Sequence, residues 1–413
     1  MGKATDTLNA RVRLPASIPD EWEWLSLSAC CRPTQWTTIP RSQLTANGFP
    51  VYGANGLIGS YAEYNHEQET IAIGCRGTCG IINRVPPKAY ITGNAMALDD
   101  VDEAVVLQGY LFYALNYRRL TDAISGSAQP QITRKGLSRV RFPCPPLPEQ
   151  RKVAAILSSV DDAIEKTQAV IDQVQVVKRG LMQELLTRGL PGRHTRFKQT
   201  KIGEIPEDWG LISLAESNAT VTSGSRGWAR YYSDEGALFL RITNLTRNTI
   251  RLELDDLKHV ALPSGSAEGK RTRVRAGDLL ISITADLGMV GVIPENFGEA
   301  YVNQHLALVR LPSNGVLPEF AGYFLTTQVA RKRFLRLNDS GAKAGLNLST
   351  IRKLTFPNPS REEQRSIVQM LSSTEDRIAL EESKLVRFAD LKSALMSALL
   401  TGELRVAPDT EAA

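Results

Sequence analysis

Two short stretches come nearest to a catalytic or cofactor-binding motif, and both fall short. Residues 358–361, NPSR, begin like the Asn/Asp-Pro-Pro-aromatic motif of adenine methyltransferases but differ at the third and fourth positions. Residues 265–270, GSAEGK, contain the lysine of a phosphate-binding loop without the correctly spaced first glycine or the following Ser/Thr. The sequence contains no acidic cluster followed by a lysine, which is the pattern that would indicate a nuclease. The sequence therefore predicts a chain without catalysis and without a cofactor.

The cysteines do not form a metal-binding pattern. Cys75 and Cys79 are four residues apart, Cys30 and Cys31 are adjacent, and the chain has only four histidines and no Cys-x-x-Cys. Paired ligands at such spacing are what zinc sites require, so we expect no metal. Five cysteines are an odd number, which favours reduced thiols inside a cell over a disulfide framework. With no apolar signal core at the N-terminus and no apolar run long enough to cross a bilayer, a cytoplasmic protein is expected.

Several arginine-rich stretches have the residue types that bind nucleic acid. Lys and Arg bind phosphates, and Arg and Asn can read guanine and adenine edges with two hydrogen bonds. The stretches are the loop 74–80, GCRGTCG, residues 225–232, SRGWARYY, and residues 269–275, GKRTRVR, whose alternating charge suggests one face of a strand or hairpin. The candidate DNA contacts are Asn55, Tyr61, Tyr64, Arg76, Thr78, Arg226, Trp228, Arg230, Lys270, Arg271 and Arg273. For each one taken singly, a solvated surface role is the commoner alternative. The arginines of residues 331–336 fit the polar face of a surface helix better.

The elements that must position these residues come from an internal duplication. Residues 149–190 and 363–404 align without gaps and share 15 of 42 residues, beginning with the same Glu-Gln-Arg. Prolines precede both copies, and Gly189 and Gly402 mark their ends, as expected for long helices. The chain has a net charge of +5, and its positive excess lies outside these copies, which gives weak support for an anionic partner.

Each copy has an apolar seam with alternating spacings of four and three residues, typical of a coiled coil. Its apolar members include Leu157, Ile164, Ile171, Leu181 and Leu185 in the first copy and Leu371, Ile378, Leu385, Leu395 and Leu399 in the second. We expect the two seams to pack on each other and to serve partner binding. Lys178 and Lys392 lie at matching seam positions. They either fix the register of the pair or extend to solvent, and the sequence leaves both open.

A second repeat opens two globular regions, which we call the first and second head. Ile18-Pro19-Asp20-Glu21-Trp22 recurs as Ile205-Pro206-Glu207-Asp208-Trp209. Short β-rich runs and helix-like stretches, opened by Gly109-Tyr110 and Gly322-Tyr323, predict mixed α and β structure in each head. The loop 74–80 has no close copy in the second head, where the sequence at 284–288 is TADLG. The expected domains are 1–145, 146–190, 191–357 and 358–413.

The chain resembles the specificity subunits of type I restriction–modification systems. The resemblance rests on PVYGANGLIG, ETIAIGCRGTCG, LPEQRKVAAIL, GLPGRHTRFKQTKIGEIPEDW and LMSALLTGELRV, which follow one another in family order over nearly the whole chain. It implies an α+β fold with two target-recognition domains separated by two long antiparallel coiled-coil helices. Each domain would read one half of a split double-stranded DNA sequence. The helices would dock two methyltransferase subunits, with restriction/translocase subunits as further partners and no membrane involved.

Two other classes of function stay open on the residues alone. A non-catalytic scaffold whose heads bind protein would share the repeats, and its modest basicity would be incidental. An enzyme with an unrecognised site is a further alternative, opposed by the missing motifs. Steep salt dependence would distinguish a DNA-binding protein from the scaffold, because bound phosphates release counterions.

Overall fold

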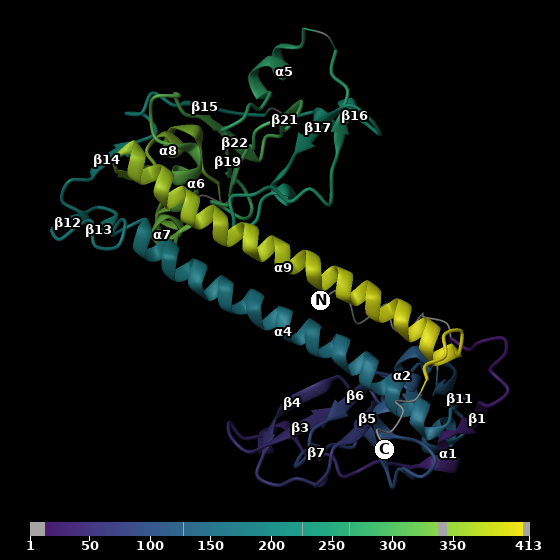
Figure 1. Ribbon diagram of the computed structural model, residues 1–413. Coiled ribbons are helices and arrows are strands. Elements are labelled where there is room, and N and C mark those ends of the chain that lie inside the picture. The colour runs from purple at the N-terminus through teal and green to yellow at the C-terminus, as the bar shows by residue number, and fades with distance from the viewer. Residues whose placement is uncertain (1–12, 127, 225, 264, 338–344, 408–413) are drawn as a thin grey trace. The chain divides into compact units, whose positions relative to one another are not determined.

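The computed structural model divides the chain into two compact units. The described residues are 13–126, 128–224, 226–263, 265–337 and 345–407. The first unit combines Met1–Gln168 with Ser383–Ala413, and the second is Ala169–Glu382. The two repeated segments are long helices, α4 (Leu147–Leu185) and α9 (Arg361–Thr401), and each contributes one half to each unit (Figure 1). The helices predicted from the repeat are therefore present.

In the first unit the first head is built on a four-stranded sheet in the order β2-β8-β5-β6 and a three-stranded sheet in the order β4-β3-β7. The strands are β1 (Glu23–Ser26), β2 (Arg32–Thr34), β3 (Phe49–Gly53), β4 (Gly56–Tyr61), β5 (Thr70–Gly74), β6 (Ile82–Val85), β7 (Tyr90–Ile91), β8 (Ala95–Asp99), β9 (Ile124–Ser125), β10 (Gln131–Ile132) and β11 (Arg141–Cys144). The helices are α1 (Leu27–Cys30), α2 (Gln108–Arg118) and α3 (Arg134–Ser138), with 3₁₀ turns at Arg41–Gln43 and Thr121–Ala123.

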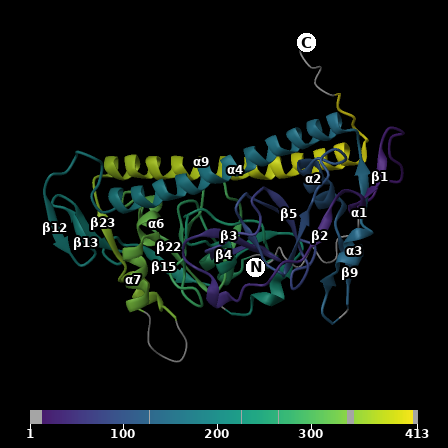
Figure 2. The same cartoon turned by 90° about the horizontal axis from the view of Figure 1, so that it is seen from below.

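In the second unit the second head has four-stranded sheets in the orders β15-β22-β19-β20 and β16-β18-β17-β21. The strands are β12 (Phe197–Thr200), β13 (Gly203–Pro206), β14 (Gly210–Ser213), β15 (Thr220–Ser223), β16 (Tyr232–Ser233), β17 (Ala237–Leu240), β18 (His259–Val260), β19 (Leu279–Ser282), β20 (Val290–Val292), β21 (Ala300–Val302), β22 (Leu306–Arg310) and β23 (Thr355–Asn358). The helices are α5 (Ala267–Thr272), α6 (Pro318–Thr326), α7 (Gln328–Arg336) and α8 (Leu348–Arg352), with 3₁₀ turns at Trp228–Tyr231 and Ile242–Asn244. Figure 2 shows α6 beside the segments of α4 and α9 that belong to this unit.

The two heads repeat one topology. The order β2-β8-β5-β6 corresponds to β15-β22-β19-β20, and the parallel pair β3–β7 corresponds to β17–β21. The mixed α and β character predicted for the heads is confirmed. The α+β fold with duplicated long helices is confirmed as well.

The Glu-Gln pair that opens each repeated helix attaches that helix to its head. Gln150 accepts the backbone N–H of Leu107, the residue before α2, at 2.8 Å, and its amide donates to the Pro145 carbonyl. Gln364 accepts the backbone N–H of Leu317, before α6, at 2.8 Å, and donates to the Pro359 carbonyl. A helix N-terminus has backbone donors with no partner in the helix itself. Each glutamine therefore satisfies one donor at the start of α2 or α6. The same hydrogen bond attaches the long helix that carries the glutamine, α4 or α9, to its head.

The neighbouring glutamates are buried under the repeated Ile-Pro-x-x-Trp motif. Glu149 accepts from Trp22 Nε1 at 3.1 Å and from Arg405 Nε at 2.8 Å. Glu363 accepts from Trp209 Nε1 at 3.2 Å and lies 2.8 Å from His194 Nε2. A buried carboxylate is tolerated only with such partners. The two repeats found in the sequence thus meet in both units.

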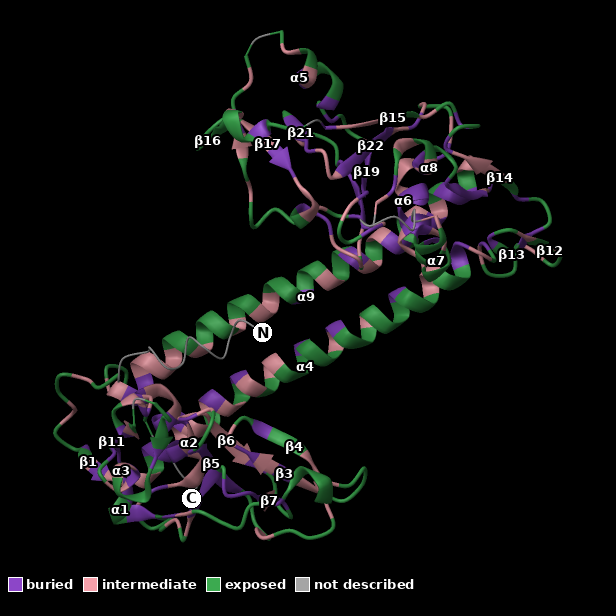
Figure 3. Cartoon of the chain, turned by 180° about the vertical axis from the view of Figure 1, so that it is seen from behind, coloured by how far each residue is buried: buried purple, intermediate pink, exposed green. Residues whose placement is uncertain are grey.

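The apolar seams of the two helices face inward within each unit. The predicted seam positions are buried or half-buried, whereas exposed residues lie between them along both helices (Figure 3). The outermost members also enter the cores of the heads: Leu157 and Leu399 in the first unit, and Leu185 and Leu371 in the second. Seam and head cores are therefore continuous, and the helices depend on the heads for part of their burial.

The two seam lysines form equivalent ion pairs with the opposite helix. Lys178 Nζ lies 2.5 Å from Glu375 Oε1 in the second unit, and Lys392 Nζ lies 2.5 Å from Asp161 Oδ1 in the first. The side chain of Lys178 is 8% exposed and that of Lys392 is 29% exposed. Between fixing the register and extending to solvent, these pairs favour the first, because each lysine meets one carboxylate at a fixed place on the antiparallel partner.

A tyrosine from each head completes the pair. Tyr323 donates to Glu375 Oε2 at 3.0 Å, and Tyr113 donates to Asp161 Oδ2 at 2.8 Å. Burial and the adjacent carboxylate raise the pKa of both hydroxyls, so they remain donors. The structural counterpart of Tyr323 is therefore Tyr113, and the sequence comparison with Tyr110 was shifted by three residues. Tyr110 donates instead to the carbonyl of Pro143.

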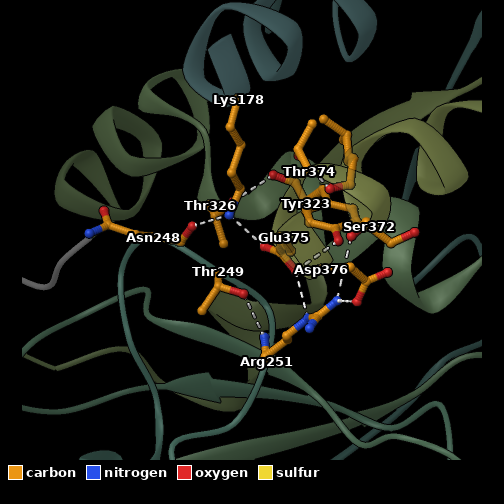
Figure 4. A network of polar contacts seen from close by, with 11 residues as sticks. Lys178, Asn248, Thr249, Arg251, Tyr323, Thr326, Ser372, Thr374, Glu375 and Asp376 are labelled. Atoms are coloured by element: carbon orange, nitrogen blue, oxygen red, sulfur yellow. Dashed lines mark hydrogen bonds and ion pairs between the residues drawn. The ribbon is translucent and has the colours of Figure 1, made fainter. Parts of the chain in front are cut away.

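The pair in the second unit belongs to a larger network (Figure 4). Lys178 also donates to the Asn248 carbonyl at 2.6 Å, and Arg251 reaches Glu375 Oε2 at 3.2 Å and Asp376 Oδ1 at 2.5 Å. The loop 248–251 of the second head is thus held to both helices through charged groups.

Truncation of the two lysines is expected to have unequal effects. Lys178→Ala leaves Glu375 buried with only Arg251 and Tyr323, so it should lower the free energy of unfolding of the second unit by about 3 kcal/mol. Lys392→Ala removes a more exposed pair and should cost about 1 kcal/mol or less. Scanning calorimetry of the two variants measures the difference. Equal effects would show that burial of the Lys178 pair does not matter.

Candidate nucleic-acid interface

The loop between β5 and β6 presents Arg76 on a tightly folded turn. Gly80 N donates to Gly74 O at 2.8 Å, and Gly74 N donates to Ile81 O at 2.8 Å. Gly77 and Gly80 have φ of 79° and 84°, a region that favours glycine. Arg76 is exposed while Cys75 and Cys79 on either side are buried. The arginine predicted to contact DNA is therefore held outward on a well-supported backbone.

The two cysteines of this loop anchor it to the head. Burial raises the pKa of Cys75 to about 11 and also raises that of Cys79. A thiol with such a pKa stays protonated near neutrality and is a poor nucleophile. The Cys79 thiol donates to the Pro130 carbonyl at 3.1 Å. These residues fix the loop against the segment before β10.

Two further polar groups lie beside Arg76. The turn between β3 and β4, which carries the exposed Asn55, packs so closely that a Cβ at Gly74 would overlap the Ala54 carbonyl oxygen. The backbone of Arg76 forms a bridge with Gln131, which is also exposed. The structure thus brings together Asn55, Arg76 and Thr78. Gln131 was missed because its link to the loop spans 55 residues of sequence and leaves no local pattern.

Tyr61 and Tyr64 lie elsewhere in the first head. Tyr61 ends β4 and Tyr64 follows it, at the end of the β3–β4 hairpin opposite the Asn55 turn. Tyr61 packs on Tyr90, and Tyr64 packs on Phe49. Both rings are therefore engaged in edge-to-face packing away from the Asn55 turn.

In the second head the predicted residues are divided between surface and core. Arg226 and Arg230 are exposed, and Arg230 stacks over Tyr231. Trp228 is buried against Phe239 and Tyr301, which makes its indole part of the core.

The strand or hairpin expected at residues 269–275 is wrong. Ser266 accepts the Gly269 N–H and caps the short helix α5, which carries Lys270 and Arg271. Arg271 pairs with Glu268 at 2.7 Å and donates to the Ser223 carbonyl, and Arg273 follows the helix as an exposed residue. This local cap outweighs the alternating charge pattern.

The Arg76 loop has a backbone counterpart in the second head, although its residues are not a close copy. The loop between β19 and β20 has the same length and hydrogen bonds: Gly288 N donates to Ser282 O at 3.0 Å, and Ser282 N donates to Met289 O at 2.9 Å. Ala285 takes the positive φ (54°) that Gly77 takes in the first head. The backbone is shared although the residues differ, which is why sequence comparison did not reveal it.

The predicted partner-binding residues face inward. All ten seam residues named above are buried or half-buried within their units. The exposed apolar side chains of the helices are different ones: Val176, Val177, Met370 and Leu380 in the second unit, and Val386 and Leu391 in the first.

The described residues form neither a metal-binding cluster nor a membrane-spanning helix. Among residues 13–126, 128–224, 226–263, 265–337 and 345–407, no group of three or more His, Cys, Asp or Glu side chains is arranged to hold a metal ion. None of the helices in this part of the chain is long and apolar enough to cross a membrane.

Comparison with known proteins identifies the family. Residues 19–175 and 239–387 match the family model for the type I restriction modification DNA specificity domain. The match covers well over half of the chain and includes the larger part of each head. The protein therefore belongs to this family and is a specificity subunit of the type I restriction–modification class.

Relatives and solved structures agree with this assignment. The chain is 26% identical over 304 residues to the type I restriction enzyme MjaVIII specificity subunit of Methanocaldococcus jannaschii, covering 72% of this chain and 70% of the relative. It is 24% identical over 420 residues to the EcoBI specificity subunit of Escherichia coli, covering 94% and 87%. The S subunit from M. genitalium shares the fold, with a TM-score of 0.64 at 14% identity over 95% of this chain and 99% of that one. A chain from a structure on assembly and conformational transition of the type I system gives 0.53 at 18% identity over 94% and 100%.

Alanine substitutions at two glycines of the Arg76 loop should distinguish the destabilisation caused by a steric clash from that caused by a positive φ. Gly74→Ala forces the Ala54 turn and the loop apart, because the new Cβ meets carbonyl oxygens of both. We expect it to destabilise the first unit by roughly 1–3 kcal/mol. Gly77→Ala meets no atom within 4 Å and has only its positive φ to accommodate, at roughly 1 kcal/mol. Thermal unfolding of both variants tests this, and a larger loss for Gly77→Ala would contradict the proposed contact between the turns.

Proposed function

We propose that this chain is the non-catalytic DNA-reading subunit of a methyltransferase and endonuclease complex, and that each head reads one half of a bipartite double-stranded target. The observation that carries the proposal is the duplication. One head topology occurs twice, on two helices that are themselves repeats, and the residues on the corresponding β5–β6 and β19–β20 loops differ. Two heads that share a topology but differ in the residues on these loops are suited to two different half-sites.

The first half-site would be contacted by the Arg76 site. A fork of guanidinium donors can make two hydrogen bonds to guanine O6 and N7, and an Asn amide can do the same with adenine. Asn55 and Arg76 are exposed and lie on adjoining turns, so both can reach one groove of DNA. Exposed arginines elsewhere on the heads would contact phosphates and supply affinity without specificity.

The helices would dock the partner subunits. Because the seam is occupied by the opposite helix and the heads, the outward apolar side chains are the surface available for another protein. The helices are duplicated, so two equivalent docking faces are expected, one for each of two methyltransferase subunits. Restriction/translocase subunits would join that assembly.

Mapping of modified bases in the host, with and without this gene, tests the function. Deletion should abolish methylation of one split motif, and a plasmid copy of the gene should restore it. A methylation map that is unchanged by deletion would contradict the proposal.

Charging the exposed face of α4 should weaken docking. Val176 is 58% exposed and Val177 is 49% exposed, so Val176→Lys with Val177→Lys should leave folding intact while reducing co-purification of the methyltransferase subunit at least tenfold. Introducing lysines into an apolar interface core leaves charges without water or partners. Gln175→Lys, which adds a charge on the same exposed stretch but off that face, serves as the control. Undiminished co-purification of the double variant would place the docking surface elsewhere.

A further inference from the structure

The residues that surround the β19–β20 loop correspond one by one to those around Arg76. In the first head Cys75 N donates to the Asn94 carbonyl, and Ile132 N donates to the Cys75 carbonyl, both close to 3 Å. In the second head Ile283 N donates to the carbonyl of His305 at 3.0 Å, and Leu346 N donates to that of Ile283 at 2.9 Å. His305 therefore stands where the first head has Asn94.

The bridging residues extend the match to the loop tip. Arg76 bridges Gln131, and Thr284 bridges Gly345. With Gly74 aligned on Ser282, Thr284 takes the place of Arg76, and Asp286 takes the place of Thr78. Both are accessible, Thr284 half-buried and Asp286 exposed.

The second head also supplies a neighbour equivalent to the Asn55 turn. β3 and β17 occupy the same place beside β7 and β21, and the segment after each strand contacts the loop. In the first head this segment is the turn that carries Asn55. In the second it carries Arg247, whose Nε donates to Asp286 Oδ2 at 3.1 Å. In both heads the loop, the segment that bridges it and the segment after β3 or β17 lie together. The residues on these three segments differ between the heads.

The side chains at this place have a different hydrogen-bonding character. Arg76 offers only donors, whereas Asp286 offers only acceptors and Thr284 offers both. Thr284 Oγ1 lies 2.7 Å from His305 Nδ1, and Arg247 holds the carboxylate of Asp286. A carboxylate has lone pairs beyond those that one arginine uses, so Asp286 can accept another hydrogen bond while it stays oriented.

We propose that Thr284 and Asp286 read base edges of the second half-site, and that Arg247 and His305 are the positioning residues that hold them. The inference rests on the proposed function and goes beyond it by naming the reading residues of the second head. Because Asp286 accepts, the expected partner is an amino-bearing edge, cytosine N4 or adenine N6, in the major groove. This locates readout on the β19–β20 loop, away from α5 and from Arg226 and Arg230.

The test uses the complete methyltransferase complex, a library of DNA duplexes with randomised half-sites, and a methyl donor. Sequencing of the methylated products gives both halves of the motif. Asp286→Ala and Thr284→Ala should each relax preference roughly tenfold or more at a position of one half-site, with the other half unchanged. Asp286→Asn keeps the size of the side chain but replaces one acceptor with a donor, and should shift the preferred base at that position. Unfolding temperatures near that of the wild type should accompany these changes.

Control variants at the other proposed contact residues show which results would overturn the inference. Arg76→Ala should alter only the other half-site. Arg226→Ala and Arg230→Ala should lower overall methylation without altering the motif. The inference is overturned if both halves of the motif survive Asp286→Ala and Thr284→Ala unchanged, or if Arg226→Ala or Arg230→Ala alters the second half-site instead. A wild-type complex that selects no split motif would overturn the proposed function itself.

Discussion

A buried carboxylate without hydrogen-bond donors is prohibitively unfavourable, and this constraint organises both units of the molecule. Glu149 on α4 and Glu363 and Glu375 on α9 are such groups. Their donors come from the opposite helix, from the heads and from the segments that follow each helix. A head that did not present its tryptophan and tyrosine would leave charges uncompensated. Carboxylate satisfaction thus couples helix pairing to head attachment.

This coupling suits a protein whose heads must differ in what they contact. The groups that attach a head lie at its base, in the tryptophan motif and at the start of α2 or α6. The groups proposed to read DNA lie on the loops after β5 and β19, which are fixed by backbone hydrogen bonds and not by the identity of the exposed side chains. Residues on these loops can therefore change without disturbing attachment. The pair Arg76 and Thr284 illustrates such a change at one structural position.

Periodic features of the chain could be predicted from its sequence. The seam, the helix starts after prolines and the repeated Ile-Pro-x-x-Trp motif are local patterns with direct physical meaning, and the structure contains all of them. The roles of Glu149 and Gln150 could not be predicted, although their repetition was visible, because their partners are distant in sequence. The β19–β20 loop was missed for another reason. The two heads share the backbone conformation of this loop but not its side chains, so sequence comparison alone does not reveal it.

The central claim, that each head reads its half of the target independently, is tested most directly by exchanging one head. Residues 1–145 would be replaced by the corresponding domain of a relative with a different target, and the methylated motif of the assembled complex would be sequenced. The account predicts that one half of the motif changes to that of the donor while the other half is retained. A change in both halves, or in neither, would contradict it.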